Sequence, residues 1–272
     1  MDWKKLNLTY KQNIIYNLEV KNMANKYNFS SDKIFIYLLL IDKSGSMSGS
    51  SEEVINGLKS YKKDFEGFPE ANSIAVSISK FANGFYPEDF KHISEINTNF
   101  YADGGTALYY SIVEGKAYLD RYVREVTEKT GCTPIVTFVL FSDGEDCSNI
   151  GNSRDAMESV EAMNLAGYTT VFVAFGSAIN SEFGKKMGFV STVDVKDRKS
   201  IANFLGVELS KSMKEQSKRE TAMGAEFLSN AKGSSSQNIL GESFFSRAEN
   251  QGGEFSHTTS QALEDDSWFD NI

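Results

Sequence analysis

The chain has 272 residues, 40% of them hydrophobic, and a formal net charge of -9 at pH 7. This length and composition suffice for a sizeable hydrophobic core in one large or two small domains. The negative charge and the lack of a basic stripe argue against binding to a nucleic-acid backbone, whereas metal ions or basic partners suit an acidic protein.

Membrane insertion and disulfide stabilisation are also not expected. No apolar run approaches the ~18 residues of a membrane-spanning helix, and the first residues lack the apolar block of a signal peptide. We therefore expect no contact with a membrane and a cytoplasmic location. The two cysteines, Cys132 and Cys147, are too few for a disulfide framework and lack zinc-ligand spacing, so we expect free thiols. The two histidines, His92 and His257, lie far apart, which argues against imidazole chemistry.

Residues 1–30 predict an N-terminal helical extension. Thr9 and Gln12 resemble a capping box, and the apolar residues Ile14, Ile15 and Leu18 follow on one helical face. We expect this helix to lie outside the main domain and to pack against it.

Residues 31–213 predict a single α/β domain. Nearly continuous apolar runs predict strands buried on both faces at Ile34 to Ile41, Ser73 to Phe81, Pro134 to Phe141 and Thr169 to Phe175. Gly84 to Phe90 predicts a short edge strand, where Pro87 is tolerated. Amphipathic stretches predict helices at Glu52 to Phe65, Ala107 to Thr127, Ser153 to Ala166 and Arg198 to Met213. This alternation indicates a Rossmann-like, doubly wound, mostly parallel sheet flanked by helices.

Oxygen-bearing side chains follow the first predicted strand, in the stretch "IYLLLIDKSGSMSG". Asp42, Ser44 and Ser46 are spaced by two residues, and Gly45 and Gly49 are expected to let the backbone turn. Hard cations such as Mg²⁺, Mn²⁺ and Ca²⁺ prefer oxygen ligands. Taken alone, the same residues also fit ordinary turn and helix-capping chemistry.

Two later loops supply residues that complete such a site. "DGGTAL" places Thr106 at the opening of a predicted helix, and "FVLFSDGED" places Asp143 at the end of a buried strand. Ligands of parallel sheets gather at the carboxyl ends of the strands. We therefore predict one metal site formed by Asp42, Ser44, Ser46, Thr106 and Asp143.

Residues 214–272 predict an acidic tail without stable structure of its own. Ser, Gly, Gln and Asn dominate "KGSSSQN" and "NQGGEFSHTTSQ", as in flexible linkers. The tail ends in "ALEDDSWFDNI", where Trp268 and Phe269 stand among acids. This segment is either a solvated terminus or a docking segment for another protein or another copy of the chain.

The segments "DKSGSMS", "GGTAL" and "LFSDGED" resemble the metal-ion-dependent adhesion site (MIDAS) of von Willebrand factor type A (VWA) domains, in chain order and approximate spacing. The resemblance covers about residues 33–213. It implies that Ser44, Ser46 and Thr106 coordinate Mg²⁺ or Mn²⁺ through their hydroxyls, and that at least one aspartate acts through water. Intracellular bacterial members of the family, some associated with tellurium resistance and stress response, are similar to this chain.

The resemblance implies a non-enzymatic, metal-dependent protein-binding module. Because neutral hydroxyls dominate the ligand set, the ion keeps much of its charge and can accept an Asp or Glu from a protein partner. The residues expected to surround the ion on the partner side are Met47, Ser48, Tyr109, Glu145 and Asp146. For Met47, Ser48 and Tyr109, helix entry or helix packing is the alternative interpretation, and Glu145 with Asp146 would favour partners that carry basic groups.

Other functions compete with this prediction. A metal-dependent hydrolase is one, although such enzymes usually use more carboxylate or histidine ligands. A second is a substrate-recruiting subunit of an ATP-driven or kinase- or phosphatase-associated complex; this chain itself has no phosphate-binding loop motif. A third is a purely structural ion that ties the loops together.

Overall fold

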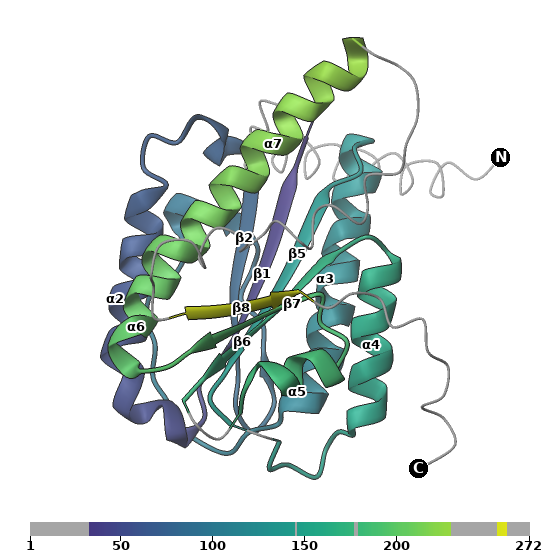
Figure 1. The fold of residues 1–272 in the computed structure, drawn as a ribbon. Helices are drawn as coiled ribbons and strands as arrows, with labels where there is room; N and C mark the ends of the chain where they lie inside the picture. Colours follow the sequence, from purple (N-terminus) through teal and green to yellow (C-terminus); the bar gives the residue numbers. More distant parts are fainter. Residues whose placement is uncertain (1–32, 145, 177–178, 230–254, 260–272) are drawn as a thin grey trace, which may run out of the picture.

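The structure is a computed structural model that describes residues 33–144, 146–176, 179–229 and 255–259 (Figure 1). The predicted helical extension at 1–30 lies outside the described residues, as do 230–254 and 260–272 of the predicted tail.

An eight-stranded sheet forms the centre of the molecule, in the order β3-β2-β1-β5-β6-β7-β8, with β4 also on β2. Its parallel strands are β1 (Phe35–Asp42), β2 (Ile74–Phe81), β5 (Ile135–Ser142), β6 (Thr169–Phe175) and β7 (Ser191–Val195). The antiparallel ones are β3 (Phe85–Tyr86), β4 (Lys91–His92) and β8 (Phe255–Thr259). The predicted parallel strands are confirmed to within one residue at each end. The predicted edge strand, residues 84–90, contains only the two residues of β3, and β4 begins directly after it.

Helices cover both faces of the sheet (Figure 1). One layer contains α2 (Ser51–Asp64), α6 (Arg198–Asn203), the π-helical segment η4 (Phe204–Glu208) and α7 (Leu209–Ser229). The other contains α3 (Leu108–Thr130), α4 (Ser153–Leu165) and the short α5 (Ser181–Lys186). The 3₁₀ turns are η1 (Gly45–Ser50), η2 (Pro69–Ser73) and η3 (Ile93–Glu95). None of the helices in the described ranges is long and apolar enough to cross a membrane.

The central strand β1 explains why both faces are covered. Its residues are all buried, and their side chains alternate between two hydrophobic clusters. Tyr37 and Leu39 belong to the cluster that includes residues of α2 and α7, whereas Leu38 and Leu40 belong to the cluster that includes residues of α3 and α4. Because successive side chains of a strand point to opposite faces of the sheet, an unbroken apolar run requires a helix layer on each side. The predicted doubly wound α/β class is confirmed.

The fold continues past Met213, where the sequence predicted the domain to end. Helix α7 runs on to Ser229, and β8 pairs with β7. Beyond Met213, Gln216 and Ser217 are buried, and Gln216 Oε1 accepts a hydrogen bond of 3.0 Å from the Tyr37 hydroxyl. Buried polar residues such as Gln216 do not add to an apolar helix face in the sequence. The change in amino-acid composition therefore predicted a domain end at Met213, before the end of α7.

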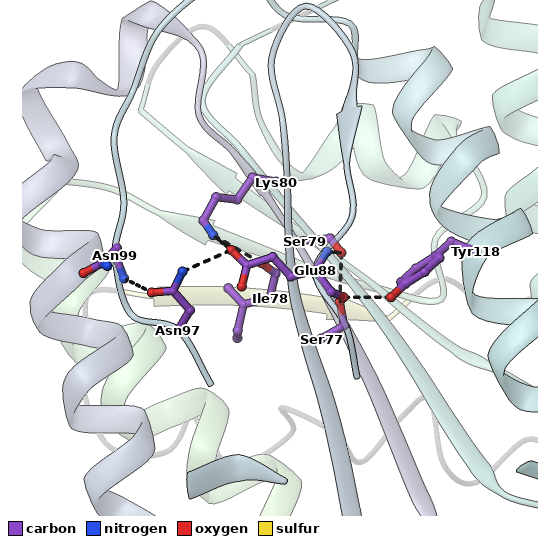
Figure 2. A network of polar contacts seen from close by, with 8 residues as sticks. All are labelled: Ser77, Ile78, Ser79, Lys80, Glu88, Asn97, Asn99 and Tyr118. Atoms are coloured by element: carbon purple, nitrogen blue, oxygen red, sulfur yellow. Dashed lines mark hydrogen bonds and ion pairs between the residues drawn. The ribbon is translucent and has the colours of Figure 1, made fainter. Parts of the chain in front are cut away.

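Strand β2 borders a polar network at the edge of the sheet (Figure 2). It pairs with β4 at one end and with β3 at the other, and the loop between them crosses its middle. There the Ser79 hydroxyl accepts the Glu88 N–H at 3.1 Å, and Glu88 O accepts the hydroxyls of Ser77 at 2.7 Å and Tyr118 at 2.8 Å. Lys80 forms an ion pair with the Glu88 carboxylate. Side-chain hydrogen bonds thus replace a strand ladder at this edge.

Candidate metal centre

The residues predicted to form a metal site lie at the carboxyl edge of the sheet, where β1, β2 and β5 end. Asp42 is the last residue of β1 and is fully buried. Its Oδ1 accepts the Ser44 N–H at 2.8 Å, and its Oδ2 accepts the Ser142 hydroxyl at 2.7 Å. Both oxygens are therefore oriented by neighbouring groups, which fixes the carboxylate at the point where β1 leaves the sheet.

Ser44, Ser46 and Asp143 form a continuous chain of oxygens from the β1 loop to the β5 loop. The hydroxyls of Ser44 and Ser46 are 2.9 Å apart, and the Ser46 hydroxyl donates to Asp143 Oδ1 at 2.8 Å. Ser44 is buried and Ser46 is exposed, so the chain of oxygens leads from the interior to the surface. Ser46 and Asp143, which are 97 residues apart in sequence, are thus in direct contact.

Backbone hydrogen bonds hold the Thr106 loop against the β1 loop. Gly45 N–H donates to Gly104 O at 2.9 Å, and Asp103 N–H donates to Lys43 O at 2.7 Å. Gly104 has φ +89°, a conformation that favours glycine. Thr106 is buried, and its N–H donates to the Cys147 sulfur at 3.0 Å. Its hydroxyl, in contrast, has no hydrogen-bond partner among the described residues.

The glycines of the first loop act differently from the prediction. Neither Gly45 nor Gly49 has a positive φ, so neither is required for a left-handed turn. A Cβ at Gly49 would lie 2.3 Å from Arg198 Nη1, and one at Gly45 would lie 3.4 Å from Gly104 O. The contact at Gly45 is an ordinary van der Waals distance, and the contact at Gly49 is with the flexible end of Arg198, so a Cβ at Gly49 would require that side chain to move.

The two carboxylates of the site have raised pKa values. Burial raises the pKa of Asp42 from 3.8 to about 6, although hydrogen bonds from Ser142 and Ser44 lower it, and the nearby Asp143 adds to the increase. Burial also raises the pKa of Asp143, whereas the hydrogen bond from Ser46 and the charge of Arg198 lower it. Both groups therefore lack compensation for a full negative charge, which a cation beside them would supply.

The residues present fit a hard divalent cation. Hydroxyl and carboxylate oxygens are the only side-chain donors of the predicted set, and these ions prefer such donors. The under-compensated Asp42 and Asp143 are a further feature of a cation site. Ser44, Ser46, Thr106 and Asp143 are the residues that would hold the ion, with Asp42 adjacent.

The residues predicted to surround the ion have mixed positions. Met47 is fully buried in the core, so its assignment to the partner side is wrong. Tyr109 is half-buried and stacks on Phe183, which agrees with the packing alternative. Ser48 is exposed.

The predicted acidic rim is only partly described. Asp146 accepts the N–H groups of Tyr109 and Ser148, both at 3.1 Å, so it binds the start of α3 and the backbone of its own loop. It is therefore less free to meet a partner than an acid without such bonds would be. Glu145 lies outside the described residues.

Other residues at the site were not predicted. Ser142 orients Asp42, and a polar residue ending an apolar strand is the signal that could have identified it. Arg198 Nη1 donates to Gly49 O at 3.3 Å, across 149 residues of sequence, so no local pattern indicates it. Lys43 Nζ lies 4.4 Å from the ring centre of Tyr86, and Tyr101 is 75% exposed close to the Thr106 loop.

Comparison with known proteins identifies similar structures but no similar sequence. No protein-family model matches the chain, and no curated protein matches it in sequence. The pilus adhesin SpaC from Lactobacillus rhamnosus GG aligns with a TM-score of 0.52 at 11% identity, over 68% of this chain and 31% of SpaC. The ArnB paralog VWA2 from Sulfolobus acidocaldarius aligns with a TM-score of 0.47 at 20% identity, over 64% of this chain and 44% of VWA2.

Proximal thread matrix protein 1 from the mussel byssus, in a structure with a zinc-occupied MIDAS motif, aligns with a TM-score of 0.47 at 13% identity. The alignment covers 64% of this chain and 46% of that protein. The chain thus spans less than half of each of these three structures. At such identities the likeness concerns the fold: a mostly parallel α/β sheet flanked by helices, shared with a domain of SpaC.

Proposed function

We propose that this chain is a VWA-domain protein that binds a protein partner through a divalent ion, Mg²⁺ or Mn²⁺. The observation that carries the proposal is the convergence of Asp42, Ser44, Ser46 and Asp143 in one hydrogen-bonded chain. The loop that bears Thr106 is fixed beside them by backbone hydrogen bonds. These are the residues and the order of the MIDAS motif. The fold shared with the pilus adhesin SpaC supports a binding role by analogy.

The chemistry of the donors favours capture of a carboxylate. When bound, the ion supplies a positive charge that neutral hydroxyls do not cancel. Ser44, Ser46 and Thr106 would hold it, while both oxygens of Asp42 accept hydrogen bonds, from the Ser44 N–H and the Ser142 hydroxyl. An Asp or Glu of a partner would supply the negatively charged ligand that the hydroxyls do not. Surrounding contacts give the specificity, because a carboxylate must lose water before it binds.

Binding is a better use of this donor set than catalysis. Hydrolytic metal sites use several carboxylate or histidine ligands to activate water. Within the described ranges, no group of three or more His, Cys, Asp or Glu side chains is placed to hold a metal. Hydroxyls outnumber carboxylates in the predicted set, so we propose that the chain is not an enzyme.

The cellular setting forms part of the proposal. The two cysteines, Cys132 and Cys147, are free thiols, which is compatible with a reducing cytoplasm. Recruitment of a substrate to a separate ATPase, kinase or phosphatase would use the same site with a different partner. The link to stress response and tellurium resistance likewise depends on which partner is identified.

A metal-binding titration combined with affinity capture tests the proposal. Mn²⁺ binding to the full chain is followed by electron paramagnetic resonance, and partners are captured from native cells with Mg²⁺ or with chelator. We expect Thr106→Ala to lose both Mn²⁺ binding and Mg²⁺-dependent capture. Thr130→Ala is the matched control, because this exposed threonine ends α3, whose first residue Leu108 lies close to Thr106 in sequence. Identical partners for wild type, Thr106→Ala and chelator-treated protein would contradict the proposal.

A further inference from the structure

The surroundings of the metal site contain exposed aromatic rings around a lysine. Lys43 lies between the candidate ligands Asp42 and Ser44, and its Nζ lies over the ring of Tyr86, 4.4 Å from the ring centre. Tyr86 is 43% exposed and Tyr101 is 75% exposed. The carbonyl of Lys43 accepts the Asp103 N–H, which brings the segment after Tyr101 to the same place. One side of the site therefore offers a cation and apolar rings.

A second cation lies on the opposite side of the first loop. Arg198, at the start of α6, is exposed and donates to Gly49 O at 3.3 Å. Its charge also acts on Asp143 of the ligand set. Lys43 and Arg198 thus flank the ligand residues on the sides of β3 and α6, while the exposed Asp103 is the opposing charge on this surface. A ligand with several carboxylates and an aromatic residue matches these features.

The chain itself contains a segment of that chemistry. Residues 262–270 read ALEDDSWFD, with three consecutive acids followed closely by Trp268 and Phe269. After Lys232, Arg247 is the only Lys or Arg in the chain, so residues 262–270 contain neither. The negative charge of the segment is therefore not cancelled by basic residues next to it in sequence.

We infer that the metal site binds the acidic-aromatic segment 262–270 of a second copy of this chain. This inference rests on the proposed function, because one acid of the segment takes the place of the partner carboxylate. The other acids then face Lys43 and Arg198, and the aromatic residues of the segment face Tyr86 and Tyr101. Charge complementarity and stacking act together with the ion.

The position of β8 favours a second copy over the same chain. Thr259 pairs with Ser191, and across β6 and β5 this level of the sheet corresponds to Leu39 in β1. Asp42 is four strand spacings away and three residues farther toward the carboxyl edge, which makes a separation of about 20 Å. The acids at 264–266 follow Thr259 by five to seven residues, which span at most about 18–25 Å when fully extended. The straight line passes through the sheet, and β8 runs antiparallel to β7, so that it ends at Thr259 on the side of the sheet away from Asp42. The path around the sheet is therefore longer than the straight line, which favours the site of a second copy for the acids at 264–266.

Binding of this kind joins unlike surfaces of two identical chains. Such a head-to-tail contact produces rings if the rotation closes and open filaments if it does not. The inference therefore predicts self-association that depends on the divalent ion and grows with protein concentration.

Two complementary variants test the inference by sedimentation velocity of the full chain. The site variant is Thr106→Ala, which keeps the segment. The segment variant keeps the site and carries Glu264→Gln, Asp265→Asn, Asp266→Asn and Asp270→Asn. We expect wild type to self-associate in Mg²⁺ and each variant alone to be monomeric. An equimolar mixture of the variants should form a 1:1 complex that chelator dissociates, and Lys43→Gln should weaken the association about two- to fivefold.

The outcomes separate this inference from the proposed function. Mn²⁺ binding is measured on the same samples by electron paramagnetic resonance. If wild type binds Mn²⁺ but the mixture stays monomeric, the inference is overturned and the proposed function stands. If wild type does not bind Mn²⁺, the proposed function fails and the inference fails with it. A monomeric wild type together with a 1:1 mixture would mean that the segment occupies its own chain's site, which also overturns the second-copy assignment.

Discussion

Two pairs of serines in this protein have the same spacing, Ser44 with Ser46 and Ser77 with Ser79, and their hydroxyls lie 2.9 Å and 2.8 Å apart. Each pair lies close to an acidic residue of a neighbouring loop. In the second pair the hydroxyls bind the backbone of Glu88, whose carboxylate is already paired with a lysine (Figure 2). At the first pair, the carboxylate that accepts the Ser46 hydroxyl, Asp143, has no ion pair with a lysine or arginine among the described residues.

The difference concerns what completes each cluster. The Glu88 network contains its own cation, Lys80, and satisfies the backbone of the crossing loop, so it holds an edge of the sheet in place. The cluster at Asp42 contains carboxylates with raised pKa values, and the Thr106 hydroxyl has no partner among the described residues. A serine-x-serine pattern thus serves structure where the chain supplies a cation, and predicts a ligand site where it does not.

The largest expected effect comes from removing a carboxylate of the cluster at Asp42. Asp143→Asn should weaken Mn²⁺ binding about 100-fold or more, because a charged ligand is lost. Without metal, the free energy of unfolding should not fall, since burial already disfavours the charged form of Asp143. Isothermal titration and chemical denaturation measure the two quantities. A clear loss of metal-free stability with unchanged affinity would mean that this cluster, too, is structural.

The Glu88 network should respond in the opposite way, by losing stability and not metal affinity. The double substitution Ser77→Ala and Ser79→Ala removes the acceptor of the Glu88 N–H and one donor to its carbonyl. We expect a loss of about 2 kcal/mol in the free energy of unfolding, equal with and without metal. Ser46→Ala is the matched control, and loss of its exposed hydroxyl should change metal-free stability by less than about 0.5 kcal/mol. Equal losses for both variants would remove the distinction between the clusters.

The pH dependence of metal-free stability sharpens the comparison further. The pKa of Asp42 is about 6 in the folded protein, against 3.8 for an exposed aspartate, so folding favours its protonated form. Its contribution to stability is full below pH 3.8 and is lost as the pH rises through 6. In chelator, we expect a loss of about 1.4 kcal/mol from this group between about pH 5 and 7.5. Asp42→Asn should remove this part of the dependence in chemical denaturation, and an unchanged pH profile would contradict the assignment.

Sequence reasoning reached the site more completely than its surroundings. Asp42 and Asp143 follow buried apolar runs, and strands of that kind place their carboxyl ends together whatever the details of packing. Short elements such as α5 and β7 gave no comparable signal, because five or six mixed residues establish neither period. Met47 was expected on the partner side of the ion, with helix entry as the alternative, whereas the η1 turn directs it into the core.

Long-range contacts were the other limit. Arg198 reaches Gly49 across 149 residues, and Tyr37 meets Gln216 across 179. No spacing rule connects residues so far apart, since their contact depends on how the helices cross the sheet. The polar residues of α7 were therefore assigned to a tail, and the cation beside the metal site was not predicted.

The smallest expected effect is also the one that separates the ion from its partner. Arg198 places a positive charge near Asp143, so Arg198→Gln should strengthen Mn²⁺ binding about two- to fivefold by removing repulsion between cations. The same substitution should weaken capture of an acidic segment by a similar factor, because that segment loses an opposite charge. Titration and sedimentation of one variant therefore give changes of opposite sign. A loss in both measurements would mean that Arg198 supports the first loop through Gly49 and does not contact the partner.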